Sequence, residues 1–197
     1  MPRMNLAALA AFVIVATLPG ASQPSSEWPT YPASEAPAVW HASVSRGDLI
    51  IATVNAAIRN ELDRHLTYGL ADPLQACHLA AIGASYGFAR EGIAVGRTSA
   101  RLRNPTNRPR PWMAAVVARY AVARARDVDG FVVDLGDRIG LLRPIVEQPM
   151  CDRCHGPVDT VDLTVRSELA RRYPADRALG FRSGDVRGWY WVELPKQ

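Results

Sequence analysis

The residues of this sequence best suited to chemistry are two cysteines and a histidine near position 150. They are Cys151, Cys154 and His155, in the pattern C-x-x-C-H. Two thiols at this spacing reach the two vinyl groups on one edge of a porphyrin and become thioethers, and the adjacent imidazole ligates the iron. The pattern therefore predicts one covalently attached haem c, with His155 as the proximal iron ligand.

Three other interpretations of the cysteine pair compete with haem: a redox-active C-x-x-C, a zinc site and a short structural disulfide. A zinc site needs four ligands, and the sequence has no second C-x-x-C and no H-x₃₋₅-H partner. A thioredoxin-like pair should open a helix after a βαβ strand, whereas the run 146–150 does not resemble a central strand. The pattern therefore favours haem.

Residues 1–22 have the features of a signal peptide. Arg3 gives a positive start, residues 6–18 form a short apolar run, and 19–22 offer small residues for cleavage. The apolar run is too short for a comfortable membrane span. We therefore expect a cleaved leader, a periplasmic or otherwise exported protein, and no membrane span after leader removal; an uncleaved anchor is the alternative. Covalent haem is attached outside the cytoplasmic membrane, in agreement with export.

Cysteine count and charge add to this interpretation. The chain has three cysteines, so an exported protein that uses Cys151 and Cys154 as thioethers leaves Cys77 over. The net charge of +4 is only a weak signal for nucleic acid, which an exported protein would rarely meet. We expect no nucleic-acid partner.

The pattern of the chain predicts an α+β domain. Residues 23–42 are rich in proline and predict a poorly ordered linker, which leaves 43–197 as the domain. Helical periodicity occurs first and a period of two follows it, so long N-terminal helices should flank an antiparallel sheet. The expected helices are 43–68, 72–88, 111–126 and 160–173, and the expected strands are 131–135, 138–145 and 186–194. In the helix 160–173 we expect Leu163, Ser167 and Ala170 to face inward.

The predicted helix 72–88 carries two candidates for the second iron ligand. Cys77 lies on its apolar face among small residues that would let a flat macrocycle approach the backbone. His78 lies about 100° further round the helix, so only one of the two can face the haem. A buried structural cysteine is the plainer alternative for Cys77.

An arginine-rich loop follows at 96–109. Arg97, Arg101 and Arg103 could bind the haem propionates through bidentate contacts. A solvated basic loop explains the same residues equally well.

A series of short motifs, in a set order along residues 43–192, carries a family resemblance. The motifs are Cys77, G-R-T-S at 96–99, R-N-P-x-N at 103–107, Trp112, P-I at 144–145, C-D-R-C-H-G at 151–156, Y-P-x-D-x-A-x-G-F at 173–181 and G-D-x-R-G at 184–188. In these motifs the sequence resembles a family of c-type haem domains, formerly of unknown function. Members have a PAS-like fold and occur as exported bacterial proteins and as sensory modules of histidine kinases.

The resemblance implies that Cys151 and Cys154 hold the haem, that His155 is the proximal ligand and that Cys77 supplies a distal thiolate. Such a thiolate stabilises Fe(III), and reduction would weaken its bond to iron. We therefore expect a redox or gas sensor, with CO or NO as the gas ligand, rather than an enzyme. A periplasmic electron-transfer cytochrome is the alternative. The partner would be a redox protein or a signalling protein.

Overall fold

The computed structural model of the protein describes residues 28–68, 83 and 86–197. The predicted signal peptide, the first part of the predicted linker, and both Cys77 and His78 lie outside the described residues. Within the described ranges, no helix is long and apolar enough to cross a membrane.

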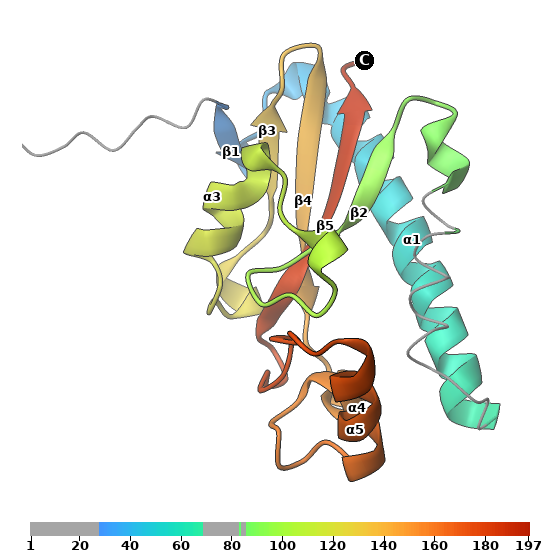
Figure 1. The fold of residues 1–197 in the computed structure, drawn as a ribbon. Coiled ribbons are helices and arrows are strands. Elements are labelled where there is room, and N and C mark those ends of the chain that lie inside the picture. Colours follow the sequence, from blue (N-terminus) through green and yellow to red (C-terminus); the bar gives the residue numbers. More distant parts are fainter. Residues whose placement is uncertain (1–27, 69–82, 84–85) are drawn as a thin grey trace, which may run out of the picture.

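Five strands form one antiparallel sheet (Figure 1). They are β1 (Thr30–Pro32), β2 (Ala94–Thr98), β3 (Phe131–Asp134), β4 (Arg138–Val146) and β5 (Val186–Pro195), in the spatial order β1-β3-β4-β5-β2. The β3–β4 hairpin and the strand β5 confirm the segments of period two. The antiparallel α+β fold class predicted from the sequence is also confirmed.

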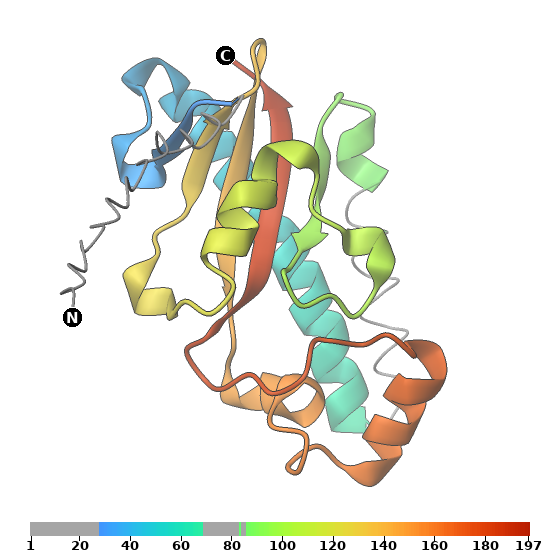
Figure 2. The same ribbon diagram turned by 60° about the vertical axis from the view of Figure 1, so that its left-hand side comes forward.

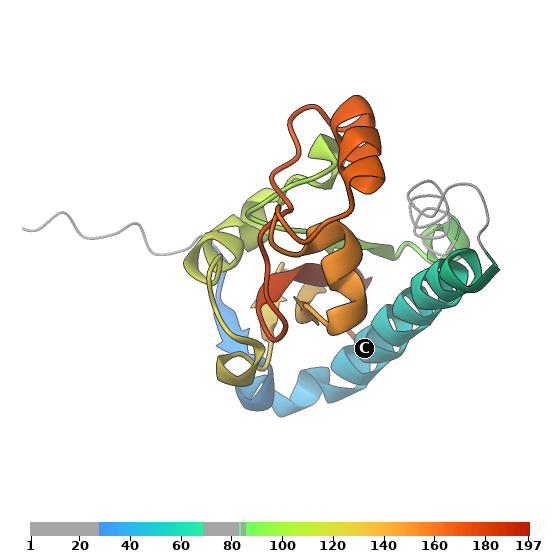
Figure 3. The ribbon, with the colours of Figure 1, turned by 90° about the horizontal axis from the view of Figure 1, so that it is seen from below.

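Helices cover both faces of this sheet (Figure 3). The long helix α1 (His41–Tyr68) packs its residues Ile51, Val54 and Ile58 against one face, where β4 contributes Leu141. The helix α3 (Pro111–Arg119) packs Trp112, among others, on the opposite face. Successive strand residues point to opposite faces, so the sheet can supply apolar side chains to both clusters.

The predicted proline-rich linker is wrong for its described part. Tyr31 pairs with Val132 as β1 joins the edge of the sheet. Trp40 is buried in the α1-side core and meets the Tyr31 ring edge-to-face, with ring centroids 5.6 Å apart. Proline is compatible with an edge strand because only one side of that strand needs hydrogen bonds. The folded domain therefore includes most of the segment that composition alone assigned to a linker.

The structure also differs from the prediction at the strand β2, at the end of the helix α3 and on the inward face of the helix α5. The strand β2 was not predicted: residues 96–98 of the expected loop belong to it, and Gly96 pairs with Trp191 so closely that a Cβ atom would come within 2.7 Å of the indole. The helix α3 ends at Arg119, earlier than predicted. In α5 (Leu163–Arg172), Leu163 is 69% exposed whereas Leu169 is 2% exposed. The predicted inward face of α5, with Ser167 and Ala170 also exposed, was therefore wrong.

Candidate functional site

The C-x-x-C-H segment lies at one end of the sheet (Figure 2). After β4 the chain forms a 3₁₀ turn, η5 (Pro149–Cys151), and then the short helix α4 (Asp152–His155). Together with α5 and the loop that follows it, these elements make a lobe beyond the sheet, and the C-terminal half of α1 extends alongside (Figures 1 and 2). Arg59 of α1 donates to Gln148 Oε1 at 3.0 Å, which ties the helix to the start of the motif.

The imidazole of His155 is held in one orientation and one protonation state. Its Nδ1 lies 2.8 Å from the carbonyl oxygen of Ala178. Because a carbonyl can only accept, Nδ1 carries the proton and Nε2 keeps its lone pair. Burial lowers the pKa of His155 well below its usual range, and the nearby Arg187 and Arg103 guanidinium groups lower it further. His155 is therefore a neutral imidazole whose Nε2 keeps the lone pair that a metal ion would need, and in this structure that nitrogen faces Nη1 of Arg187 at 3.2 Å and Nη1 of Arg103 at 3.5 Å.

Arg103 and Asp176 fix the carbonyl that orients the imidazole. Arg103 Nε lies 2.9 Å from Asp176 Oδ2, and its Nη2 donates to the carbonyl oxygens of Cys154 and Ala178. The other oxygen of Asp176 accepts from the Ala178 amide at 2.8 Å. One ion pair therefore joins the loop after β2, the end of α4 and the loop after α5. Both partners belong to motifs of the family resemblance, R-N-P-x-N and Y-P-x-D.

The two thiols of the motif are one helical turn apart. Cys151 and Cys154 are both free and partly buried. Burial is the main cause that raises the pKa of Cys154, so this sulfur stays a protonated thiol at neutral pH. Gly156 follows the motif because a Cβ atom there would come within 2.7 Å of the Asp152 carbonyl oxygen. The helix can then turn sharply just after His155.

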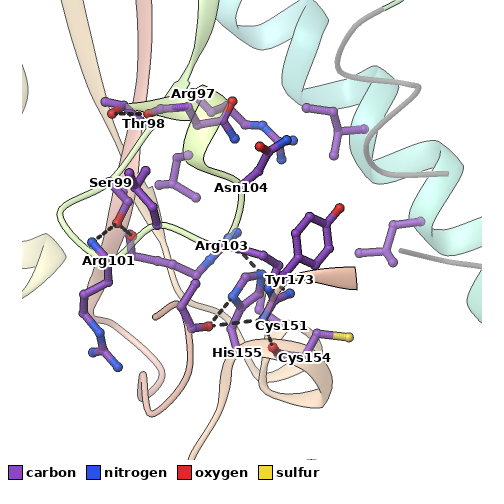
Figure 4. A pocket seen from close by; sticks show the side chains of 18 of the residues that line it. Arg97, Thr98, Ser99, Arg101, Arg103, Asn104, Cys151, Cys154, His155 and Tyr173 are labelled. Carbon is purple, nitrogen blue, oxygen red and sulfur yellow. Dashed lines mark hydrogen bonds between the residues drawn. The ribbon is translucent and has the colours of Figure 1, made fainter. Parts of the chain in front are cut away.

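A cavity opens between this motif, α1 and the loop after β2. Its apolar lining includes Ile58, Leu62, Leu66, Leu102, Ile145 and Met150, and its polar lining includes Arg97, Arg103, Asn104, Cys151, Cys154, His155 and Arg187. Figure 4 shows His155, Arg103 and Cys154 gathered at one side of it, with Arg97 across from them. Apolar walls with an arginine border suit a flat apolar ring that carries acidic groups, such as a porphyrin with its propionates.

The three predicted propionate ligands have different environments. Arg97 lines the cavity from β2. Arg103 also lines it, but its guanidinium is already engaged with Asp176 and the Cys154 carbonyl. Arg101 lines the cavity as well, but it points away from Arg97 and His155 in Figure 4, and its guanidinium carbon lies 4.0 Å from the centroid of the Phe181 ring. All three arginines therefore line the cavity, but the guanidinium group of Arg103 supports the His155 loop and that of Arg101 stacks on an aromatic ring.

The sequence interpretation missed Arg187. Strand pairing passes from Ile145–Gly188 to Val146–Val186, so Arg187 is the extra residue of a β-bulge in β5. Bulges redirect a side chain out of the regular pleat. Arg187 Nη1 accordingly reaches within 3.2 Å of His155 Nε2, and its Nε lies 2.7 Å from Glu147 Oε2. The G-D-x-R-G motif contains Arg187, but only the bulge shows where its side chain goes.

The fold and the site together define an α+β domain with an apolar, arginine-bordered cavity at one end of an antiparallel sheet. The chain belongs to the Tll0287-like family, which matches residues 40–195. This membership confirms the family predicted from the short motifs. A solved relative, the cyanobacterial haem protein Tll0287, aligns with a TM-score of 0.58 and 22% identity over 80% of this chain and 97% of that one. At this identity the likeness shows a shared fold. A search among curated proteins found no match to this chain.

Proposed function

We propose that the protein is an exported monohaem c-type haem protein that senses redox state or a diatomic gas. One observation carries the haem part of this proposal. The Ala178 carbonyl holds the imidazole so that Nε2 of His155 keeps its lone pair, within a turn of two free thiols and at an apolar cavity bordered by arginines. The solved relative is itself named as a haem protein, which supports the same conclusion.

The chain's own residues supply each part of the attachment. The thiols of Cys151 and Cys154 would each add across one vinyl group, so that sulfur bonds to one vinyl carbon and the thiol proton goes to the other. This addition needs no oxidant. His155 Nε2 would ligate the iron, and Arg97 would face the acidic side of the ring. When bound, haem supplies a one-electron Fe(III)/Fe(II) couple and a metal site for diatomic gases.

Cys77 is our proposal for the distal ligand. Leu66, near the end of α1, and Arg97, in β2, both line the cavity, and Cys77 lies between them in the sequence. The family resemblance implies a thiolate at this position. A thiolate that stabilises Fe(III) and is released on reduction would couple the oxidation state to a movement of its chain segment. If His155 and Cys77 both held the iron, no open iron position would remain for a substrate, so we propose no catalytic turnover.

Mass spectrometry and absorption spectra of the exported protein test the haem proposal. We expect a coloured protein whose mass exceeds that of the mature chain by one haem that denaturation does not extract. Cys151→Ala combined with Cys154→Ala should lose the covalent link. His41→Ala is the control for a histidine away from the cavity. Because His41 is exposed at the start of α1, this variant should leave the spectrum unchanged. A colourless protein with the mass of the bare chain would contradict the proposal.

Cys77→Ala tests the distal ligand. It should keep the covalent haem but convert the ferric spectrum from low spin towards high spin. An unchanged spectrum would assign the position to His78 or to another residue.

Binding of CO to the reduced protein distinguishes the sensor from the electron carrier. A sensor whose distal ligand leaves on reduction should bind CO readily, with the Soret shift of a ferrous carbonyl. An electron carrier should keep both ligands in both oxidation states and bind CO poorly. Failure to bind CO would therefore favour the electron-transfer cytochrome.

A further inference from the structure

Glu147 is a completely buried acid that haem attachment does not require. Its side chain is 0% exposed, at the point where the chain leaves β4. Its amide donates to the Asp185 carbonyl and its own carbonyl accepts from the Gly184 amide, both at 2.9 Å. Two backbone hydrogen bonds therefore hold Glu147 inside the protein. A buried carboxylate is costly unless it is paired, so its surroundings decide its charge.

Two charged side chains face the Glu147 carboxyl group, one from β5 and one from α4. Arg187 Nε lies 2.7 Å from its Oε2. Asp152, in the helix that carries the haem motif, places a second carboxyl group beside it, and Asp152 Oδ1 is itself buried. The carboxylate of the nearby Asp185 is instead paired with Arg124. Glu147 thus lies between a guanidinium group, which it contacts, and a second carboxyl group.

This arrangement favours a bound proton. With both acids ionised, the group would hold a net negative charge in a buried place, which one guanidinium cannot fully compensate. Burial is the main cause that raises the pKa of Glu147 to about 7, and the Asp152 carboxylate also raises it, against the opposing effect of Arg187. The neighbouring Asp152 carboxyl group therefore favours the protonated form of Glu147.

Arg187 connects this group to the ligand of the iron. The same guanidinium that contacts Glu147 lies with its Nη1 3.2 Å from His155 Nε2. Only one side chain therefore separates the buried acids from the proposed iron site. A change of one unit of charge at the iron, one side chain away and in surroundings of low polarity, would be strongly felt by the buried acids.

We propose that Glu147, together with Asp152 and Arg187, is a proton-binding site coupled to the oxidation state of the haem iron. This proposal rests on the haem proposed above. As a one-electron donor converts Fe(III) to Fe(II), the Glu147 carboxylate takes one proton from solvent and becomes a neutral carboxyl group. Reoxidation removes the electron and returns the proton. The charge of the site is therefore the same before and after the electron arrives.

Potentiometric titration of the haem-loaded protein with small redox mediators tests the coupling. Between about pH 5.5 and pH 8.5, the midpoint potential should fall as the pH rises, with a slope that approaches one proton per electron near neutrality. Glu147→Gln should reduce this slope at least twofold. Glu168→Gln is the matched control, because Glu168 pairs with Arg171 and Arg172 on α5, and it should leave the slope unchanged.

Two results would overturn the proposal: a potential that does not change with pH in the wild-type protein, or a slope that Glu147→Gln leaves intact. The second result would assign the proton to a propionate or to the distal ligand. If Glu147→Gln does not accumulate, Asp152→Asn provides a second test. Removal of its charge should move the sloping region to lower pH, and an unmoved region would count against the site.

Infrared difference spectra give a readout that does not depend on the potential. Reduction of the wild-type protein should produce the C=O band of a protonated carboxyl group, and this band should be absent from Glu147→Gln. Its absence from the wild type would reject proton uptake at Glu147. A protein without haem would fail earlier, by being colourless, so the two proposals fail in distinguishable ways.

Discussion

The sheet and the lobe that carries the C-x-x-C-H motif are stabilised in different ways. The sheet is covered by apolar side chains on both faces, including the fully buried Leu141. The lobe buries few apolar residues, of which Leu169 is one, and relies on the Arg103–Asp176 ion pair and on hydrogen bonds such as that of His155. The comparison teaches that the sheet provides stability, whereas polar contacts give the site its geometry.

The largest effect should come from the sheet. Leu141→Ala would remove a side chain with 0% exposure from the α1-side core and should lower the free energy of unfolding by about 2–5 kcal/mol. Chemical denaturation measures this change. Leu163→Ala is the control, because Leu163 is mostly exposed in the lobe, and it should change the value by less than about 0.5 kcal/mol. Equal losses would contradict the division between the two regions.

The second effect is a dependence of stability on pH at the boundary between the regions. The folded pKa of Glu147 is raised from 4.5 to about 7, so the folded chain binds this proton more tightly than the unfolded chain. The stabilisation that this bound proton gives the folded protein is fully present below the pKa that Glu147 has in the unfolded chain. It is lost as the pH rises through the pKa that Glu147 has in the folded chain. The unfolding free energy of the wild type relative to Glu147→Gln should therefore fall by about 2–3 kcal/mol between pH 5 and pH 8. If the difference in unfolding free energy between the wild type and Glu147→Gln stayed constant or grew as the pH rose, the raised pKa of Glu147 would be contradicted.

The third effect should be confined to the lobe. Arg103→Ala would break the pair with Asp176 and leave a carboxylate that is 7% exposed without its partner, at a cost of about 1.5–3 kcal/mol. Hydrogen exchange should become faster in α4, α5 and the loop after α5, while the amides of β4 and β5 stay protected. Arg103→Lys should restore little, because an ammonium group cannot reproduce the separate Nε and Nη2 contacts. Faster exchange throughout the sheet would show that the lobe and the sheet unfold together.

The smallest effect should come from Arg101. Its guanidinium stacks on Phe181 and its Nε donates to the Arg177 carbonyl, so Arg101→Ala should cost about 0.5–1 kcal/mol. The haem potential should change less than it does in Arg97→Ala, because the Arg101 guanidinium, although at the cavity border, is turned towards Phe181 and Arg177. A larger shift for Arg101→Ala than for Arg97→Ala would mean that Arg101 turns toward a propionate when haem is bound.

Local patterns predicted much of the sheet. The β3–β4 hairpin and β5 follow an alternation of apolar and polar residues, which depends only on neighbouring positions. The strand β1 was missed because three residues, one of them a proline, are too short to show a period. The faces of α5 were also misjudged, since its few apolar residues do not show on which side the rest of the lobe packs.

The candidate site, too, was predicted from the sequence only in part. Cys151, Cys154 and His155 lie within five residues of one another, so their spacing alone was enough to predict haem attachment. The roles of Arg103 and Asp176 could not be predicted, because 73 residues separate them along the chain.

The sequence by itself determined the C-x-x-C-H motif, the family and most of the strands, because each depends on residues close together in the chain. The tertiary structure alone decided that Ala178 orients His155, that a bulge turns Arg187 toward the imidazole, and that Glu147 is buried beside Asp152. The orientation of the imidazole and the charge of the buried acids depend on burial and on distances between distant segments, and these exist only once the chain is folded.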